Sequence, residues 1–258
     1  MSPPGTVERA LGALVDPLDR VNRRIEDALV PGIPDPFDAY EDLLTSIPSS
    51  RALHFGSGRD KHGLAGALSG EVVSVDADAT GLSRNATGLR VLGDGHRLPF
   101  ADDAFDLAFS EFVLEHLPDP VAALAEIDRV VAPGGQVVVL VPNPRHYYAR
   151  VADRTPFRFH TFVHRLQGKA SPEIDAFPTL YRWGRYEEVV EPGIDGWRLR
   201  TIQGFPGPTG YTRVTPFHAA FVLLDCLLAC SIRYHVAYLA HYEVDGAKTT
   251  RRPVPAGR

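Results

Sequence analysis

The chain has 258 residues, of which 44% are hydrophobic and 23% charged, and its formal net charge is −5. This composition is ordinary for a globular protein with one large domain, and the negative charge gives no indication of a general nucleic-acid binder. The longest apolar run, 217–230, contains His218 and Asp225 and is too short to span a bilayer. We therefore expect no stable membrane insertion and interpret this run as a buried helix.

The cysteines and the N-terminus bear on the cellular compartment. Cys226 and Cys230 lie four residues apart in the apolar run, a spacing that favours packing within a helix over metal binding. The N-terminus has no apolar signal core. Both observations lead us to expect a reducing, cytoplasmic location.

Residues 1–50 are predicted to form a helical segment. Asp16-Pro17 and Asp35-Pro36 each combine an N-cap residue with proline at the first helical position. Apolar residues follow each pair at helical spacing, so we expect two helices packed beside the core. The second helix could also cover a bound ligand.

Strands and helices alternate after residue 50. The apolar strands are followed by helices over 62–68 and 120–131, and the pattern predicts a parallel sheet covered on both faces. The predicted strands are Ala52–Phe55, Glu71–Asp76, Arg90–Leu92, Asp106–Ser110 and Gln136–Asn143, the last after a Pro-Gly-Gly stop.

The C-terminal part has a different pattern. Trp197–Ile202 and Val236–Val244 are predicted strands. Between the strands lie two insertions, 144–195 and 206–233, which are rich in aromatic residues, arginine, histidine and proline. The main domain therefore spans 51–245, and the polar tail 246–258 is expected to be loose.

A Gly-x-Gly turn follows the first strand and is the first indication of function. Gly56 and Gly58 allow backbone N–H groups to approach a cofactor closely. A dinucleotide fingerprint needs a third glycine where this chain has Lys61. S-adenosylmethionine (SAM) has no phosphate and does not need that glycine, so the turn favours SAM.

Five segments in the right order resemble the class I SAM-dependent methyltransferases, in particular the type 11 group. They are "ALHFGSG", "VDAD", "GDGHRLPFADDAFDLAFS", "EFVLEHLPDP" and "IDRVVAPGGQVVVLVPN", and they cover about Ala52 to Asn143. The resemblance implies an α/β fold with a Rossmann-like seven-stranded sheet in the order 3-2-1-4-5-7-6. The last strand would be antiparallel, with helices on both faces and helical insertions forming a lid.

The resemblance also implies the cofactor contacts. Gly56 and Gly58 would approach the methionine part of SAM, and Asp76 would bind the ribose hydroxyls. Ser110 and Glu111 would line the floor beneath the sulfonium.

The segment after the third strand would hold the adenine. Asp94 would accept a hydrogen bond from the adenine amine, and Gly95 and His96 would place backbone near the adenine edge. Leu98 and Phe100 are suited to the adenine face.

One position departs from the family pattern. His54 stands where the family usually has an acidic residue that helps to hold the ammonium group of SAM. Asp60 could supply that charge instead. Alternatively, His54 is a hydrogen-bonded strand residue and backbone carbonyls hold the ammonium.

His116 is the candidate catalytic base for a hydroxyl acceptor, because it follows the fourth strand at the cofactor end of the sheet. The alternative is that it caps or packs the adjoining loop. Methyl transfer itself is an in-line displacement that needs chiefly alignment.

The insertions supply the candidate acceptor residues. His146, Tyr147 and Tyr148 follow the fifth strand, and they either line the acceptor pocket or pack the insertion. Arg182 and Trp183 could hold an anionic or sugar-like acceptor, or belong to a lid packed through its aromatic residues.

A metal site has little support. His160 and His164 lie four apart, but threonine follows His160 where metal proteases have glutamate, and no third ligand is evident. A packed or substrate-facing helix is the alternative, and we expect no metal.

The sequence thus predicts a SAM-dependent methyltransferase acting on a small-molecule acceptor, such as a natural product or a sugar-like compound. O-methylation is favoured over N- and C-methylation. The alternatives are an NAD(P)-binding oxidoreductase and a non-catalytic SAM-fold binding protein. The sequence leaves the pathway and the oligomeric state open, a homodimer included.

Overall fold

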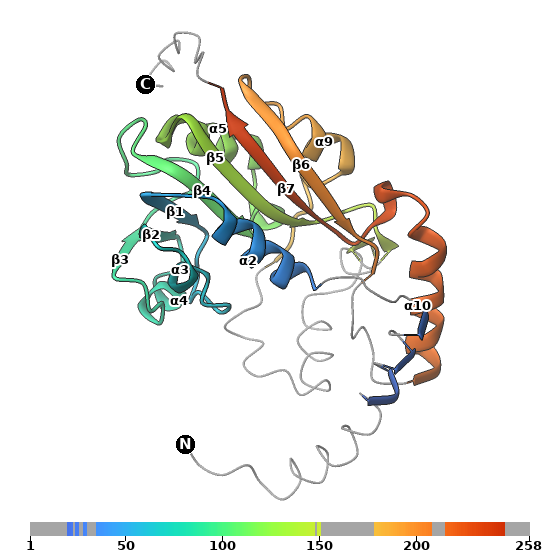
Figure 1. The fold of residues 1–258 in the computed structure, drawn as a ribbon. Helices are drawn as coiled ribbons and strands as arrows, with labels where there is room; N and C mark the ends of the chain where they lie inside the picture. The colour runs from blue at the N-terminus through green and yellow to red at the C-terminus, as the bar shows by residue number, and fades with distance from the viewer. Residues whose placement is uncertain are drawn as a thin grey trace, which may run out of the picture. The chain divides into compact units, whose positions relative to one another are not determined.

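The computed structural model describes residues 20–22, 24–25, 28–29, 35–147, 149–150, 178–207 and 215–245, the last with side chains from 218 onward (Figure 1). These residues fall into two compact units. The larger contains 36–142, 179–203 and 238–245, and the smaller contains the remaining described residues.

The described elements follow the alternation that the sequence predicts. The helices are α2 (Pro36–Ser46), α3 (Leu64–Ala67), α4 (Ala79–Ser83), η1 (Leu114–His116), α5 (Pro120–Val130), α9 (Tyr186–Val190), α10 (Thr215–Leu228) and η2 (Ile232–Tyr234). The strands are β1 (Arg51–Phe55), β2 (Glu71–Asp76), β3 (Leu89–Leu92), β4 (Phe105–Glu111), β5 (Val131–Pro142), β6 (Trp197–Phe205) and β7 (Ala237–Val244).

The seven strands form one sheet in the order β3-β2-β1-β4-β5-β7-β6, which confirms the predicted fold class. β1 pairs in parallel with β2 and β4, and the pairs β2–β3 and β4–β5 are also parallel. β7 runs the other way. The N–H of Val236 donates to the carbonyl of Phe205 (2.8 Å) and that of Asp245 to Gly196 (2.6 Å), so β7 begins where β6 ends.

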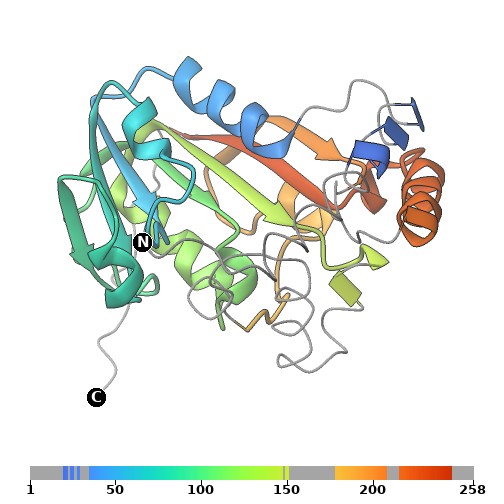
Figure 2. The ribbon, with the colours of Figure 1, turned by 90° about the horizontal axis from the view of Figure 1, so that it is seen from below.

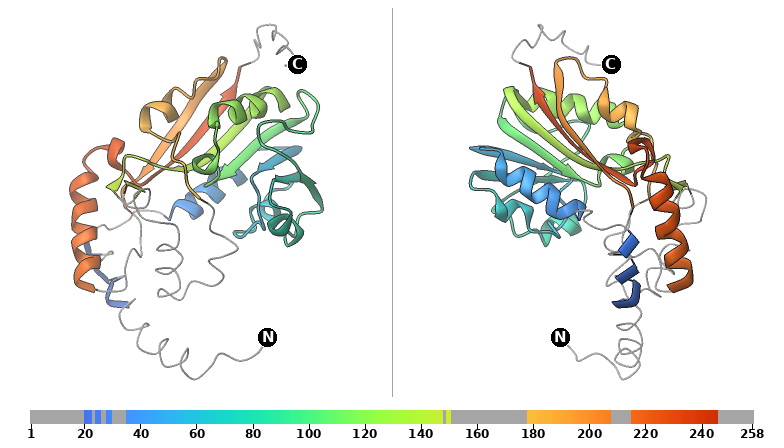
Figure 3. Two further views of the ribbon diagram at one scale, coloured as in Figure 1. Left: turned by 180° about the vertical axis from the view of Figure 1, so that it is seen from behind. Right: turned by 45° about the vertical axis from the view of Figure 1, so that its right-hand side comes forward.

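The central strands are buried on both faces because helices cover them. Four of the five residues of β1 are buried, as are the four central residues of β2. α2 lies over one face of the sheet, and α5 and α9 lie over the opposite face (Figures 2 and 3). Asp119 caps α5 by accepting the N–H of Ala122 (3.1 Å), and Pro120 occupies its first turn as expected.

Asp128 interrupts the apolar stripe of α5 for a structural reason. Its Oδ1 accepts the indole N–H of Trp197 at 3.0 Å, so this carboxylate ties α5 to β6. The polar residue within this stripe thus has a hydrogen-bond partner that lies far away in the chain.

The predicted start of the fifth strand is wrong. β5 begins at Val131, directly at the end of α5, and the Pro-Gly-Gly segment lies within it as a bulge. Opposite this bulge, Phe105 pairs with Val131 and Leu107 already pairs with Gln136, so β5 carries extra residues. Gly134, with φ +80°, provides the left-handed backbone that the bulge requires.

The interpretation of the apolar run as a buried helix holds for one face of α10 only. His218, Val222 and Asp225 are buried, whereas Leu223 and Leu227 are 52% and 73% exposed. The expected packing of the cysteines is likewise only partial. Cys226 is half-buried and Cys230 is exposed.

Two further expectations concern segments at the edge of the described residues. The helix after Asp35-Pro36 is confirmed as α2, with Tyr40 and Leu44 buried. Residues 16–19 lie outside the described residues, although 20–22, 24–25 and 28–29 are helical. Within the described ranges, every helix is too short or too polar to cross a lipid bilayer.

The bulge in β5 leads to a stability prediction. A Cβ at Gly135 would lie 2.8 Å from the carbonyl oxygen of Ala132 and 3.0 Å from that of Asp106. Gly135→Ala should therefore lower the free energy of unfolding by about 1–3 kcal/mol through overpacking. Urea denaturation measures this change.

Gly134→Ala is the matched control, because no described atom lies within 4 Å of its Cβ position. Its cost should be only the strain of a left-handed residue, about 1 kcal/mol. If Gly135→Ala is the milder of the two substitutions, the close backbone approach at the bulge is refuted.

Candidate functional site

The glycine turn after β1 is bent and open. Gly56 and Gly58 have φ of +69° and +46°, and the N–H groups of Gly56 and Ser57 donate to the carbonyl of Val75 (2.9 and 3.1 Å). A Cβ at Gly56 would collide with the side chain of Val113, whereas no described atom lies within 4 Å of that position at Gly58. Gly56 is therefore needed for packing, and the backbone of Gly58 is accessible to a ligand.

Asp76, at the carboxyl end of β2, holds this turn in place. Its Oδ2 accepts the N–H of Gly58 (2.6 Å) and its Oδ1 accepts the N–H of Asp78 (2.7 Å). Asn85 donates from Nδ2 to the carbonyl of Gly58 (3.1 Å). A carboxylate has about four acceptor sites, so Asp76 can still accept hydrogen bonds from a diol.

The loop after β3 carries Asp94 at its surface. Oδ1 of Asp94 accepts the N–H of His96 (2.9 Å) and lies 2.8 Å from its Nδ1. The backbone N–H of His96 is the main cause that lowers the pKa of Asp94. Gly95 lies against Phe55, where a Cβ would approach the ring to 2.6 Å. Since both contacts of Asp94 use Oδ1, its Oδ2 faces solvent and can accept a ligand amine.

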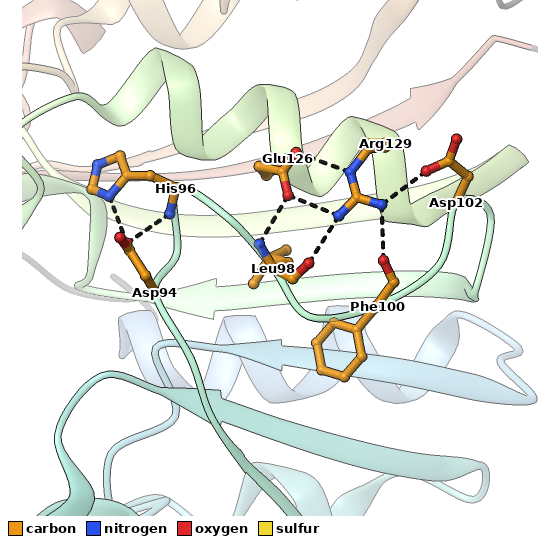
Figure 4. Close-up of polar contacts among 7 residues, drawn as sticks. All are labelled: Asp94, His96, Leu98, Phe100, Asp102, Glu126 and Arg129. Atoms are coloured by element: carbon orange, nitrogen blue, oxygen red, sulfur yellow. Dashed lines mark hydrogen bonds and ion pairs between the residues drawn. The ribbon is translucent and has the colours of Figure 1, made fainter. Parts of the chain in front are cut away.

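Glu126 and Arg129 on α5 fix the following loop (Figure 4). The guanidinium of Arg129 donates to the carbonyls of Leu98 (3.0 Å) and Phe100 (2.8 Å) and to Oδ1 of Asp102 (2.8 Å). Oε2 of Glu126 accepts the N–H of Leu98 at 2.8 Å, and Arg129 holds the pKa of Glu126 below its usual range. The sequence analysis did not predict these contacts, because Glu126 and Arg129 lie 28 and 31 residues away from Leu98 in the chain.

Two carboxylates flank the glycine turn on its other side. Asp60, with φ +49°, accepts the N–H of Leu64 (2.9 Å) and of Ala65 (3.2 Å) and so caps α3. Glu111 ends β4, and its pKa is raised to about 7, first by burial and then by the charge of Asp60, while Lys61 offsets part of the shift. Ser110, the neighbour of Glu111, is buried.

His54 is fully buried and makes no hydrogen bond through either ring nitrogen in the described structure. Its ring stacks on Phe109 at a centroid distance of 4.4 Å, and burial lowers its pKa to about 3. The interpretation of His54 as a hydrogen-bonded strand residue is therefore wrong. The imidazole is neutral near pH 7 and packs as an aromatic ring.

His116 lies in η1, directly after β4, and its side chain is 26% exposed. Its Nε2 is 3.7 Å from Oε1 of Glu115. Glu115 is buried, and burial raises its pKa to about 8, so this carboxyl is mostly protonated at pH 7. The backbone carbonyl of Glu115 accepts the N–H groups of Leu180 (2.7 Å) and Tyr181 (3.0 Å), which anchors the end of the first insertion on η1.

The other candidate acceptor residues differ in their exposure to solvent. Arg182 is exposed and donates to the carbonyl of Pro118 (2.7 Å), while Trp183 is 3% exposed and therefore packs in the interior. In the smaller unit, His146 is buried, with Nε2 3.3 Å from Oδ1 of Asp225. Tyr147 stacks on the ring of Phe221 at 5.9 Å.

Some predicted residues fall outside the described structure. Tyr148, His160 and His164 lie there, so the structure does not address the acceptor or metal roles considered for them. In the ranges that the structure does describe, no group of three or more His, Cys, Asp or Glu side chains could hold a metal ion.

Comparison with known proteins finds similarity over part of the chain. The family model described as "Methyltransferase domain", of type 11, matches residues 53–139. An uncharacterised 37.1 kDa protein in transposon TN4556 of Streptomyces fradiae is 38% identical over 113 residues, which cover 40% of this chain and 33% of that protein. The demethylmenaquinone methyltransferase of Mycolicibacterium paratuberculosis is 47% identical over 66 residues, 26% of this chain and 28% of that protein.

The structural likeness extends further along the chain. The crystal structure of the [4+2]-cyclase SpnF superposes with a TM-score of 0.54 at 17% identity, covering 90% of this chain and 95% of that one. At this identity the likeness concerns the fold alone. The chain spans a third or less of the length of the two curated relatives above.

The sheet order and the glycine turn are those of the class I SAM-dependent methyltransferase fold, and residues 53–139 are similar to the type 11 group of these enzymes.

The loop clamp leads to a prediction for stability. Arg129→Met removes the guanidinium that bridges two carbonyls and two carboxylates. Because hydrogen bonds to charged groups contribute about 1.5–3 kcal/mol each and part is regained from water, we expect a net loss of about 1–3 kcal/mol. Urea denaturation measures this loss.

The control is Arg200→Met, which breaks a 3.3 Å pair with Glu243 in which the arginine side chain is 50% exposed. An exposed pair of this kind contributes about 0–1 kcal/mol. Equal destabilisation by the two substitutions would contradict the special role of Arg129.

Proposed function

We propose that the protein transfers the methyl group of SAM to a small-molecule acceptor, with an oxygen nucleophile favoured. The observation that carries this proposal is the charge at the glycine turn. Asp60 precedes α3, and its carboxylate accepts the N–H groups of Leu64 and Ala65 in the first turn of that helix. A dinucleotide would need those N–H groups for its pyrophosphate. A carboxylate at this place repels a pyrophosphate and favours a cofactor with positive charges.

The residues around the turn fit SAM in several respects. Gly58 offers open backbone, and Asp76 retains acceptor sites for the ribose hydroxyls. Asp94 would accept the adenine amine through Oδ2, and Gly95 and His96 would lie along the adenine edge. Leu98 is held by the clamp on α5.

SAM supplies an activated sulfonium methyl that is displaced in line by the acceptor. The protein has to align the acceptor and exclude water, which can lower a barrier by about 7–11 kcal/mol. His116 would take the proton from a hydroxyl acceptor, since it is partly exposed and follows β4. Arg182 is exposed and donates to the carbonyl of Pro118, two residues after His116, and it would contact an acidic or sugar-like acceptor.

Burial limits which of the candidate residues could contact an acceptor directly. Trp183 is buried, so its contribution would be to shape the segment that carries Arg182. His146 and Tyr147 belong to the smaller unit, and the side chain of His146 is buried beside Asp225, so the acceptor proposal rests on Arg182. The relative from Mycolicibacterium paratuberculosis is named for a quinone acceptor, and a hydroxylated ring is one acceptor class to test.

The test is a calorimetric titration of the protein with SAM, NADH and NADPH. SAM should bind and neither dinucleotide should bind at comparable concentration. A transfer assay with methyl-labelled SAM and a panel of phenols, sugars and quinones then identifies the acceptor class. Preferential binding of a dinucleotide would refute the proposal.

Asp76→Ala should weaken SAM binding by about tenfold or more, since hydrogen bonds to a charged group contribute about 1.5–3 kcal/mol. The same substitution at Glu71, the exposed residue at the other end of β2, is the control and should leave SAM affinity unchanged. Equal SAM affinity for wild type and Asp76→Ala would remove Asp76 from the site.

His116→Ala should reduce turnover of a hydroxyl acceptor by about 10²–10⁴-fold, with SAM affinity nearly unchanged. The measurement is kcat beside the SAM dissociation constant. A turnover within about twofold of wild type would assign His116 to packing instead.

A further inference from the structure

Glu111 carries a carboxyl group that the protein itself leaves poorly neutralised. Its Oε2 is buried and accepts no hydrogen bond from the described residues. Burial and the nearby charge of Asp60 raise its pKa to about 7, and Lys61 compensates only part of this. The carboxylates of Asp60 and Glu111 thus form a pair with excess negative charge beside the glycine turn.

Tyr40 on α2 is a second polar group beside Glu111. It is fully buried, and the backbone of Ser110 is the hydrogen-bonding group next to its hydroxyl, in a contact short of full hydrogen-bond geometry. Burial, followed by the negative charge of Glu111, raises the pKa of Tyr40, while the Ser110 backbone opposes the rise. A buried hydroxyl that is satisfied this incompletely is unusual and calls for an explanation.

Aromatic rings border the same place. Phe37 on α2 stacks on His62 with a centroid distance of 3.8 Å and lies 5.7 Å from Phe112. Phe112 directly follows Glu111 and has a left-handed backbone with φ +50°. α2 therefore contacts both segments that carry the carboxylates, and a charge held between them would be partly shielded from water.

His54 cannot supply negative charge to this region. It occupies the strand position that precedes the turn, but its imidazole is neutral and stacked on Phe109. Besides Asp76, whose two oxygens accept backbone N–H groups of Gly58 and Asp78, the carboxylates near the turn include those of Asp60 and Glu111.

A bound ammonium satisfies this arrangement better than a sulfonium does. An ammonium has three N–H donors, which can be shared between two carboxylates and can reach the buried Oε2 of Glu111. A sulfonium has no donor and would leave that oxygen without a hydrogen bond.

We infer that Asp60 and Glu111 together bind the α-ammonium group of SAM, and that this binding requires Glu111 to lose its proton. The inference rests on the proposed function and gives the Glu111 carboxyl a role other than lining the floor beneath the sulfonium. Tyr40 and α2 close the site on one side. Cofactor binding is therefore coupled to pH through a group on β4.

The sign of the coupling follows from the direction of the pKa shift. A cation favours ionised Glu111, so SAM affinity is low below the pKa of the free protein and rises as the pH increases through it. The titratable groups around Glu111 are Asp60 and Lys61 beside the turn, Tyr40 on α2, and His62, which stacks on Phe37. Among these residue types, only histidine has an ordinary pKa, about 6.5, that lies between pH 5.5 and 7.

The experiment is calorimetric titration of the full chain with SAM from about pH 5.5 to 7, where an α-ammonium with an ordinary pKa of about 7.7–8.0 stays protonated. SAM affinity should rise about tenfold over this range. Titrations at about pH 6 in two buffers of different ionisation enthalpy should show release of most of one proton on binding. 5′-Methylthioadenosine, which lacks the ammonium, should bind with a flat profile, whereas S-adenosylhomocysteine, which keeps it, should retain the slope.

Glu111→Gln should flatten the profile of SAM, abolish the proton release and weaken SAM binding about tenfold at pH 7. The unliganded variant should also unfold at a higher temperature than wild type at about pH 8. Because the pKa of Glu111 is higher in the folded protein than in the unfolded chain, the free energy of unfolding of the wild type falls as the pH rises from 4.5 to about 7. Glutamine does not ionise, so the variant avoids this loss.

Glu115→Gln is the matched control, because Glu115 is also a buried carboxyl with a raised pKa but lies beside His116. It should keep the wild-type pH profile of SAM affinity. Asp60→Asn, which can still cap α3, should move the rise in affinity to lower pH, since it removes a charge that raises the pKa of Glu111. This second variant tests the pair should Glu111→Gln fold poorly.

The outcomes separate the two proposals. Wild-type SAM affinity that is independent of pH, or a slope that survives Glu111→Gln, overturns the ammonium site while the methyltransferase proposal stands. A slope that S-adenosylhomocysteine loses assigns the charge to the sulfonium and also overturns it. Absence of SAM binding at every pH refutes the proposed function itself.

Discussion

The carboxylate of Asp76 is the junction on which the geometry of the cofactor end depends. Its two oxygens accept the N–H groups of Gly58 and Asp78, so it joins the turn after β1 to the segment after β2. These strands are adjacent and parallel, and their carboxyl ends therefore meet at one edge. With the turn fixed in this way, Gly58 keeps its left-handed backbone and its open surroundings.

The two carboxylates beside that junction are stabilised to different extents. Asp60 is stabilised by the N-terminus of α3, whereas Glu111 has burial and a like charge against it. A protein selected for stability alone would replace Glu111 by a neutral residue. Keeping a half-buried acid at the end of β4 is understandable where a cationic ligand completes the site, at the expense of the free protein.

The sequence pattern predicted a covered parallel sheet because each parallel strand is a short apolar run bounded by a turn and helix starts carry Asp-Pro pairs. The number and order of the strands came from the resemblance to the methyltransferases. β5 was misplaced at its N-terminal end because its bulge depends on pairing with Phe105 and Leu107, a long-range contact without a local signal. By contrast, the positions of Asp76 and Asp94 could be predicted, because each lies at or just after the end of a strand that has a local sequence signal. Helical spacing also predicted that Tyr40 packs against the core, whereas the partners of Arg129 could not be predicted, because tertiary packing decides them.

The insertion is coupled to the candidate base through the backbone of η1. The carbonyl of Glu115 accepts two N–H groups from the segment that carries Arg182, and Arg182 itself donates to Pro118 on the other side of His116. Any movement of this segment must therefore break hydrogen bonds within one or two residues of His116. The protonated carboxyl of Glu115 lies beneath the same attachment, and its ionisation would bury a charge there. In the proposed function, acceptor recognition by Arg182 and positioning of His116 would therefore depend on one short stretch of backbone.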